Sequence, residues 1–379
     1  MVSNKLKKIC FFFDSRATYS YSKNVIKQIY KFKNLKYSTI ISGTYLDKKF
    51  GNISKNFKID NIKIGKKIKF KTSSNKIYSW SYNLGEAIKN YSKTLDRFKP
   101  DLIVLTGDRI ETLAISLTAS YMNIPTAHIQ AGDKSGHIDD LARGAIAKFS
   151  NIHFPSCKDS LKRLVKWGEC KKRIFNVGAP QLDDIYEFLS KHNKRKQNKL
   201  ENILLIFHPV LNQINQIETQ IKNIFEALLY FNVPINIIYP NNDFGYSKII
   251  KYIHKYNKRK KIKVFKNLDR NKFLRLLDNT SVIVGNSSCG IIEAPSFKIP
   301  TINIGNRQNE RPKAKSVIDT DFNKENIIKS INYVFNNKNF KKKLLITKNI
   351  FYKKNSGYEI CKILDKILNK KIFFKMEKY

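Results

Sequence analysis

The apolar residues of this chain fall into short, nearly unbroken runs that alternate with longer segments in which apolar residues recur at helical spacing. A run of about four to eight apolar residues between turn residues is typical of a strand buried on both faces of a sheet. Regular alternation of such strands with helices predicts βαβ units and a parallel sheet covered by helices. The strands predicted in the first half are Lys8–Phe13, Tyr37–Ser42, Leu102–Thr106, Thr126–Gln130, Ile152–Pro155 and Ile174–Val177.

The amphipathic segments between these runs predict the helices. In the first half they are Asn83–Phe98, Arg109–Met122, Asp139–Phe149 and Lys158–Trp167. The second half repeats the scheme, with strands at Asn202–Phe207, Ile235–Tyr239, Ile262–Phe265, Val282–Gly285 and Thr301–Ile304. Its predicted helices are Ile214–Phe231, Tyr246–Lys255, Arg270–Leu277, Ile291–Phe297, Lys324–Asn336 and Tyr358–Lys370.

Length and one polar segment indicate two domains. At roughly 100–200 residues per domain, 379 residues predict two. The segment Lys191–Lys199 has no apolar residue and is typical of a solvated linker or a helix end. We expect residues 1–180 and 181–357 to form two Rossmann-like, doubly wound α/β domains that face a central cleft. Ligands of such folds bind outside the carboxyl ends of the strands, so polar residues directly after a strand are the site candidates.

Cysteine usage and hydrophobicity indicate a cytoplasmic protein. The five cysteines are an odd number and form no CxxC pair, which argues against a disulfide framework and a zinc site. The apolar stretch Ile9–Phe13 is too short for a signal peptide. No apolar run approaches the roughly 18 residues of a membrane span. We expect reduced thiols, a cytoplasmic location and no membrane partner.

The formal charge of +42 raises the question of nucleic-acid binding. The lysines are spread over the whole chain, however, and Asn and Ile are abundant beside them, which is typical of drift toward AT-rich codons. No recognition-helix, RRM or zinc-finger pattern is present in the sequence. We therefore predict no nucleic-acid partner, and a positive field that attracts an anionic substrate.

Candidate chemistry in the first half follows two predicted strands. Gly107-Asp108-Arg109 comes after the strand that ends at Thr106, and helix N-capping is the favoured interpretation of Asp108 taken alone. The next strand leads into a loop rich in acid–base groups, which is typical of a reaction site. For Asp140 alone, a surface ion pair is an adequate interpretation. The polar residues of this strand and loop are His128, Gln130, Asp133, His137, Asp139, Asp140 and Arg143.

Candidate chemistry in the second half is typical of anion binding. His208 ends a strand, so it either projects toward a ligand or is a buried, hydrogen-bonded histidine; the two are about equally expected. Small residues after the strand at Val282–Gly285 resemble a phosphate cradle at a helix N-terminus. Neither the P-loop spacing nor GxGxxG is present, so NAD is not implied. The candidates for holding phosphate or ribose are Ser287, Ser288, Gly290, Glu293, Arg307 and Arg311.

Five separate segments carry a family resemblance. They are GDRIE at 107–111, AHIQAGDKSGHIDDLARGAIAKFSNIHF at 127–154, NVGAPQLD at 176–183, FHPV at 207–210 and GNSSCGIIEAPSFKIPTINIGNRQ at 285–308. In order and spacing they resemble the UDP-N-acetylglucosamine 2-epimerases, specifically the hydrolysing branch that makes N-acetylmannosamine for sialic acids. The resemblance covers about residues 9–320. It implies a GT-B-like fold whose C-terminal helix, within 358–379, packs back on the first domain, a nucleotide-sugar partner and no metal or redox cofactor.

The resemblance implies elimination of UDP to a 2-acetamidoglucal, followed by addition of water with the opposite configuration at C2. Asp108, Asp139 and Arg143 match family positions in or beside the reacting centre. His208 would contact phosphate and help the leaving group depart. The residues implied to hold the nucleotide are Arg16, Ser287, Ser288, Gly290, Glu293, Arg307 and Arg311.

Three positions depart from the family pattern. Gln130 stands where Glu is usual, and an amide cannot take up a proton at neutral pH, so the base is Asp108, Asp139 or Asp133, or the chemistry is altered. Around Arg16 the family has Gly before and Asp after, whereas this chain has Asp14-Ser-Arg-Ala-Thr18. Gly144 replaces a usual histidine.

Several alternatives stay open at this stage. The closest is the same reaction on a nucleotide-linked 2,4-diacetamido sugar of the legionaminic type. A glycosyltransferase of the same architecture would release UDP only with an acceptor, and a non-catalytic relative would bind UDP without turnover. A homodimer is predicted only because symmetric dimers are the commonest oligomers.

Overall fold

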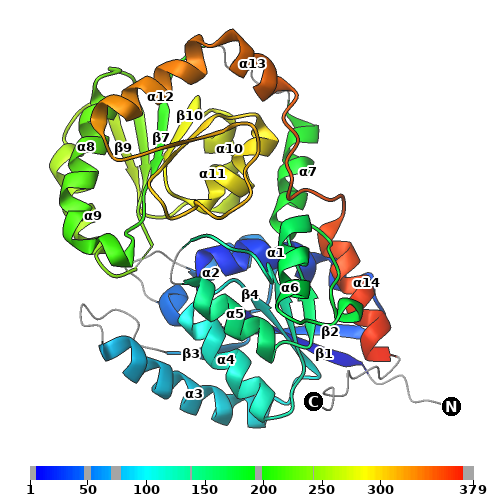
Figure 1. Cartoon of the computed structure of the whole chain (residues 1–379). Helices are drawn as coiled ribbons and strands as arrows, with labels where there is room; N and C mark the ends of the chain where they lie inside the picture. Colours follow the sequence, from blue (N-terminus) through cyan, green and yellow to red (C-terminus); the bar gives the residue numbers. More distant parts are fainter. Residues whose placement is uncertain are drawn as a thin grey trace. The chain divides into compact units, whose positions relative to one another are not determined.

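A computed structural model describes residues 6–46, 53–69, 78–136, 139–192, 199–241 and 243–369. His137 of the acid-rich loop, residues 193–198 of the polar segment and residues 370–379 lie outside the described residues. The chain divides into two compact units (Figure 1). Unit 1 comprises Met1–Asp133, Asp139–Asp184 and Phe351–Tyr379, and unit 2 comprises Lys134–Ile138 and Ile185–Ile350.

Unit 1 is built on a parallel six-stranded sheet, sheet A, in the order β3-β2-β1-β4-β5-β6. This is the order of a Rossmann fold, in which the connections leave in opposite directions on either side of β1 and β4. The strands are β1 (Lys7–Phe13), β2 (Leu35–Ser42), β3 (Lys66–Ile68), β4 (Leu102–Thr106), β5 (Thr126–Ile129) and β6 (Ile152–Phe154). The helices are α1 (Arg16–Ile29), α2 (Ile53–Ile59), α3 (Tyr78–Phe98), α4 (Ile110–Tyr121), α5 (Asp139–Phe149), α6 (Lys158–Lys166) and α14 (Ser356–Asn369), with 3₁₀ turns at Gly43–Leu46, Lys171–Arg173 and Pro180–Leu182.

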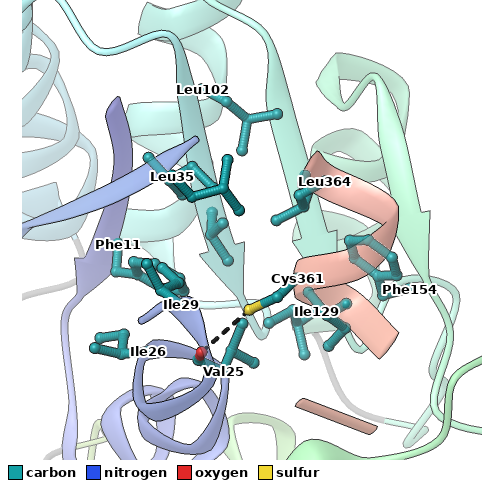
Figure 2. Packing of buried hydrophobic residues seen from close by; sticks show 14 of the residues in the cluster. Phe11, Val25, Ile26, Ile29, Leu35, Leu102, Ile129, Phe154, Cys361 and Leu364 are labelled. Atoms are coloured by element: carbon teal, nitrogen blue, oxygen red, sulfur yellow. Dashed lines mark hydrogen bonds between the residues drawn. The ribbon is translucent and has the colours of Figure 1, made fainter. Parts of the chain in front are cut away.

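The C-terminal helix α14 completes the core of unit 1. Its buried residues pack with those of α1 and of the central strands in one hydrophobic cluster. Figure 2 shows Cys361 of α14 beside Val25 of α1, and the Cys361 thiol donates to the Val25 carbonyl at 3.2 Å. The last described helix of the chain therefore covers the first sheet.

Unit 2 contains a second parallel six-stranded sheet, sheet B, in the order β12-β11-β10-β7-β8-β9. The Rossmann order recurs here, with β7 and β10 at the point where the connections reverse. The strands are β7 (Ile203–Ile206), β8 (Ile235–Ile238), β9 (Ile262–Phe265), β10 (Val282–Gly285), β11 (Thr301–Ile304) and β12 (Val317–Thr320). The helices are α8 (Ile217–Leu229), α9 (Tyr246–Tyr256), α10 (Arg270–Asp278), α11 (Ser288–Ile292), α12 (Lys324–Asn336) and α13 (Lys338–Leu345), with 3₁₀ turns at Leu211–Gln216 and Ala294–Phe297; α7 (Asp183–Lys191) starts in unit 1 and ends in unit 2.

The predicted fold class is confirmed, and most predicted elements differ from the observed ones only at their ends. The strand predicted at Ile174–Val177 is wrong, because only Ile174 makes an isolated bridge to β6 before Gly178 turns the chain at a φ of +84°. The helix predicted at Ile291–Phe297 is α11 followed by a 3₁₀ turn, since Pro295 has no N–H for a continuous helix. No helix within the described ranges has the length and apolar character needed to cross a membrane.

Candidate active site

Asp108 follows β4 and forms an ion pair with a buried arginine. Gly107 turns the chain at a φ of +80°, which favours glycine. The N-cap of α4 is Arg109, with extended backbone, so the interpretation of Asp108 as an N-cap is wrong. Asp108 instead accepts a hydrogen bond from Arg143, and its side chain is 21% exposed.

Arg143 joins three segments at the carboxyl edge of sheet A. Its side chain is only 4% exposed, and its guanidinium donates to Asp108, to Asp140 Oδ1 at 2.6 Å and to the Asp133 carbonyl at 2.9 Å. The ion pair expected for Asp140 is thus present, but the surface position expected for it is wrong, because the Arg143 and Asp140 side chains are only 4% and 15% exposed. Asp139 is the first residue of α5 and is partly buried, in the helix turn that favours a carboxylate.

Asp133 anchors the loop after β5. Its Oδ1 accepts hydrogen bonds from Ser156 at 2.5 Å and from Ser160 at 2.6 Å, and the residue is 3% exposed. A buried carboxylate held by two hydroxyl groups is well suited to fixing the loop on the β6–α6 connection. This geometry favours Asp133 as a structural anchor over Asp133 as the base.

Gln130 lies directly after β5, next to the turn that carries Asp108. The Gly107 N–H donates to the Ile129 carbonyl at 3.3 Å, which holds the two loops together. Gln130 has a φ of +64°, is 6% exposed and donates its backbone N–H to the Phe154 carbonyl at 3.0 Å. Its side-chain Nε2 is buried and has no hydrogen-bond partner in the part of the chain that the structure describes.

His128, on β5, serves the fold. Its Nε2 lies 2.7 Å from the Gly107 carbonyl and the residue is fully buried. Burial lowers its pKa from 6.5 to about 4, with a further lowering from His153, against a smaller opposing effect of the Gly107 hydrogen bond. The ring is therefore neutral at neutral pH, and Nε2 is the donating nitrogen.

This depressed pKa predicts an acid-labile fold. The unfolded chain gains a proton on His128 as the pH falls through 6.5, whereas the folded chain does not until about pH 4. Stability present above pH 6.5 is therefore lost toward pH 4, at about 1.4 kcal/mol per pH unit from this group. We expect the free energy of unfolding in urea to fall by about 2 kcal/mol from this source between pH 6.5 and pH 5. The variant His128→Gln should show a shallower fall, and parallel curves would contradict the assignment.

Arg16 begins α1 in a turn that its neighbours hold rigidly. Ser15 caps the helix by accepting from the Thr18 N–H at 3.3 Å. Asp14 is fully buried and accepts from Thr112 at 2.6 Å and from Thr18 at 3.2 Å, and burial raises its pKa. The two departures at this turn, Asp14 and Thr18, thus bond to each other. Burial lowers the pKa of Arg16.

Gly144 differs from these positions because nothing constrains it. A Cβ placed there would meet nothing within 4 Å, so α5 has room for a larger side chain at this point.

In unit 2, His208 follows β7 and is fixed by the loop after β10. Its backbone N–H donates to Asn286 Oδ1 at 2.7 Å, and Asn286 Nδ2 donates to its carbonyl at 2.8 Å. Its Nδ1 accepts from the Asn241 N–H at 3.0 Å, so the neutral ring carries its proton on Nε2. His208 is thus a buried, hydrogen-bonded histidine whose Nε2 is a donor.

The loop after β10 collects the other predicted anion-binding residues. Ser287 caps α11, accepting from the Cys289 N–H at 3.5 Å, and Ser288 is the first helical residue. Arg307 donates to the Asn286 carbonyl at 3.2 Å and lies 3.9 Å from Asp243. Gln308 donates to the same carbonyl, and Arg311 donates to Gln308 at 2.9 Å, which brings this arginine to the same loop.

The two remaining predicted ligand residues of unit 2, Glu293 and Gly290, contact α10 and β11. Glu293, 7% exposed, accepts from Arg270 at 2.5 Å, so its carboxylate is held in place from α10. Gly290 packs against β11, where a Cβ would lie 2.6 Å from Thr301 Cγ2. Its small size is explained by this packing. The sequence analysis did not identify Asn286 or Arg270. Asn286 follows a strand, so the carboxyl-end rule could have identified it, whereas no sequence pattern marks Arg270.

Comparisons with known proteins relate the chain to one family. The model of the UDP-N-acetylglucosamine 2-epimerase family matches residues 27–365. A protein of Legionella pneumophila named UDP-N,N'-diacetylbacillosamine 2-epimerase (hydrolyzing) is 32% identical over 87% of this chain and 89% of its own. A UDP-N-acetylglucosamine 2-epimerase of Neisseria meningitidis is 32% identical over 86% of this chain and 87% of its own.

A solved structure shares the fold. The UDP-GlcNAc 2-epimerase from Neisseria meningitidis superposes with a TM-score of 0.79 at 20% identity, over 95% of this chain and all of that one. Two parallel six-stranded sheets of Rossmann order, covered by helices, define a two-domain α/β protein. The chain belongs to the UDP-N-acetylglucosamine 2-epimerase family.

Proposed function

We propose that this chain is a hydrolysing 2-epimerase that converts UDP-N-acetylglucosamine and water to N-acetylmannosamine and UDP, for sialic-acid-type sugars. The observation that carries the proposal is the Asp108–Arg143 pair at the carboxyl edge of sheet A, in a chain of this family. A neighbouring guanidinium favours the ionised form of a carboxyl group, and only the ionised form can act as a proton acceptor. That is the group which removal of the C2 proton requires.

In the proposed reaction, Asp108 takes the C2 proton while the bond from C1 to the phosphate oxygen breaks. The electron pair of the C2–H bond forms the C1–C2 double bond of a 2-acetamidoglucal, and the departing oxygen takes the C1–O pair. Water then adds its hydroxyl group to C1, and C2 receives a proton on the opposite face. Asp139, at the start of α5, lies in the same acid-rich segment and is the proposed group that orients water or returns the proton.

The carboxyl edge of sheet B is proposed to hold the UDP. Arginines form strong, charge-assisted hydrogen bonds to phosphate, and the proposed contacts in unit 2 are Arg307 and Arg311. The His208 Nε2–H donates to the departing phosphate oxygen. Backbone N–H groups and hydroxyls at Ser287 and Ser288 add neutral donors, and Glu293, held by Arg270, accepts from the ribose hydroxyls.

A second candidate substrate is a UDP-linked 2,4-diacetamido sugar. It is favoured by the name of the Legionella pneumophila relative, a hydrolysing UDP-N,N'-diacetylbacillosamine 2-epimerase. The open space at Gly144 and the amide at Gln130 are two departures from the family pattern. Such departures are expected in an enzyme that binds a different sugar. The reaction and the nucleotide are the same in both cases.

Incubation with each UDP-sugar in deuterated water tests the proposal. We expect UDP and a free 2-epimeric sugar that carries deuterium at C2, without any acceptor sugar. UDP release that depends on an acceptor would indicate a glycosyltransferase. UDP binding without turnover of any substrate in the panel would indicate a non-catalytic relative.

Replacing Arg307 tests the nucleotide-holding edge. Arg307→Ala should raise the Kd for UDP about 10- to 100-fold, because a charge-assisted hydrogen bond contributes about 1.5–3 kcal/mol. Calorimetric titration with UDP measures it. Arg275→Ala, at an exposed position of α10, is the matched control and should leave the Kd unchanged. Equal Kd values for both variants would remove Arg307 from the site.

A further inference from the structure

Gln130 carries a buried donor that the fold leaves unused. Its Nε2 has no hydrogen-bond partner among the described residues, although the residue is only 6% exposed. Leaving a buried N–H unpaired destabilises a protein, whereas an apolar side chain of the same shape would avoid that cost. The backbone adds a second cost, because a φ of +64° is unfavourable for a residue with a Cβ.

The donor lies next to the turn that carries Asp108, the proposed base. The Gly107 N–H donates to the Ile129 carbonyl, so Gln130, the residue after Ile129, lies beside the turn that leads to Asp108. In the proposed reaction Asp108 removes the proton on C2. The substituent on that carbon is the acetamido group, whose carbonyl oxygen is a neutral acceptor. The guanidinium of Arg143 is already engaged by Asp108, Asp140 and the Asp133 carbonyl.

We infer that Gln130 is a specificity-determining residue whose Nε2–H donates to the carbonyl oxygen of an N-acyl group on the sugar. The inference rests on the proposed function in that the ligand is a UDP-linked sugar. The amide of a glutamine at this position can donate a hydrogen bond to the ligand, whereas the carboxylate of a glutamate can only accept one. Gln130 therefore selects for the acyl group and takes no part in proton transfer.

The test compares ligands with and without the acyl group. Wild type, Gln130→Met and Gln130→Glu are titrated with UDP, UDP-glucose and UDP-N-acetylglucosamine. Gln130→Met keeps the length of the side chain and loses the amide. We expect it to weaken binding of the N-acetyl ligand about tenfold, with UDP and UDP-glucose unchanged and the Tm unchanged or higher. A purely structural role would lower the Tm and affect all three ligands alike.

Gln220→Met is the matched control, because Gln220 is a buried glutamine of α8 whose Nε2 already donates to Gln213. It should leave the three Kd values in their wild-type ratio. If Gln130→Met leaves the ratio of the three Kd values unchanged, the inference is overturned. A raised kcat in Gln130→Glu would also overturn it, because position 130 would then be that of a catalytic base which the natural glutamine impairs. Absence of turnover in wild type with the expected ratio of Kd values would refute the proposed reaction and leave the role of Gln130 standing.

Discussion

Asp108→Asn is expected to lower kcat by about 100- to 10,000-fold while UDP binds with its wild-type affinity. Asn has nearly the same shape, so it keeps an oxygen for Arg143 and removes only the charge and the ability to take up a proton. Loss of a positioned general base has an effect of this size, and binding of UDP alone involves no proton transfer from the sugar. Steady-state kinetics with the substrate that wild type turns over, together with titration of UDP, measures both quantities.

Asp140→Asn is the control for this prediction. Asp140 also pairs with Arg143, and its side chain is 15% exposed against 21% for Asp108. The two substitutions thus remove comparable ion pairs, but only Asp108 is proposed to touch substrate. A severalfold loss at most is expected for Asp140→Asn. If Asp139→Asn, and not Asp108→Asn, abolishes turnover, the base lies at the start of α5.

The extent to which the sequence predicted the fold depended on how buried each element is. β4 and α5 have the predicted bounds, because unbroken apolar residues or a clear helical period define them against polar neighbours. Two of the four edge strands, β3 and β12, were not predicted. β3 reads Lys66-Lys67-Ile68 and β12 reads Val317-Ile-Asp-Thr320, and each is short and half exposed, so neither has the continuous apolar run of a central strand.

The sequence predicted where the candidate residues lie in the fold, but not the bonds that they make. Asp108, Gln130, His208 and Ser287 follow strands, as the carboxyl-end rule requires of candidate residues. Their partners are distant in sequence. Arg143 is 35 residues from Asp108, and Ser160 is 27 residues from Asp133, so no local pattern could show that one carboxylate is paired and the other is an anchor.

Removing Arg143 should have the largest effect on stability of the variants considered. Arg143→Met keeps much of the buried volume but removes one charged donor from two carboxylates and one carbonyl. Because a partly buried carboxylate that loses its cation becomes costly, we expect the free energy of unfolding to fall by about 3 kcal/mol. Urea unfolding monitored by circular dichroism measures this loss. Arg163→Met is the matched control: Arg163 donates to the Gly132 carbonyl of the same loop, and loss of that single contact should cost about 1 kcal/mol.

A double-mutant cycle that combines Asp108→Asn with Arg143→Met separates the Asp108–Arg143 ion pair from the other contacts of Arg143. If the cost of Arg143→Met comes mainly from the charge left on Asp108, the double variant should recover about 1–3 kcal/mol relative to the sum of the single variants. Equal, additive losses would mean that Arg143 stabilises the unit through Asp133 and Asp140 alone. In that case Asp108 would owe its ionised state to other groups, and the same cycle would weaken its assignment as the base. Stability and catalysis thus meet at one guanidinium, since the side chain that holds the three segments of unit 1 together also pairs with Asp108, the proposed base.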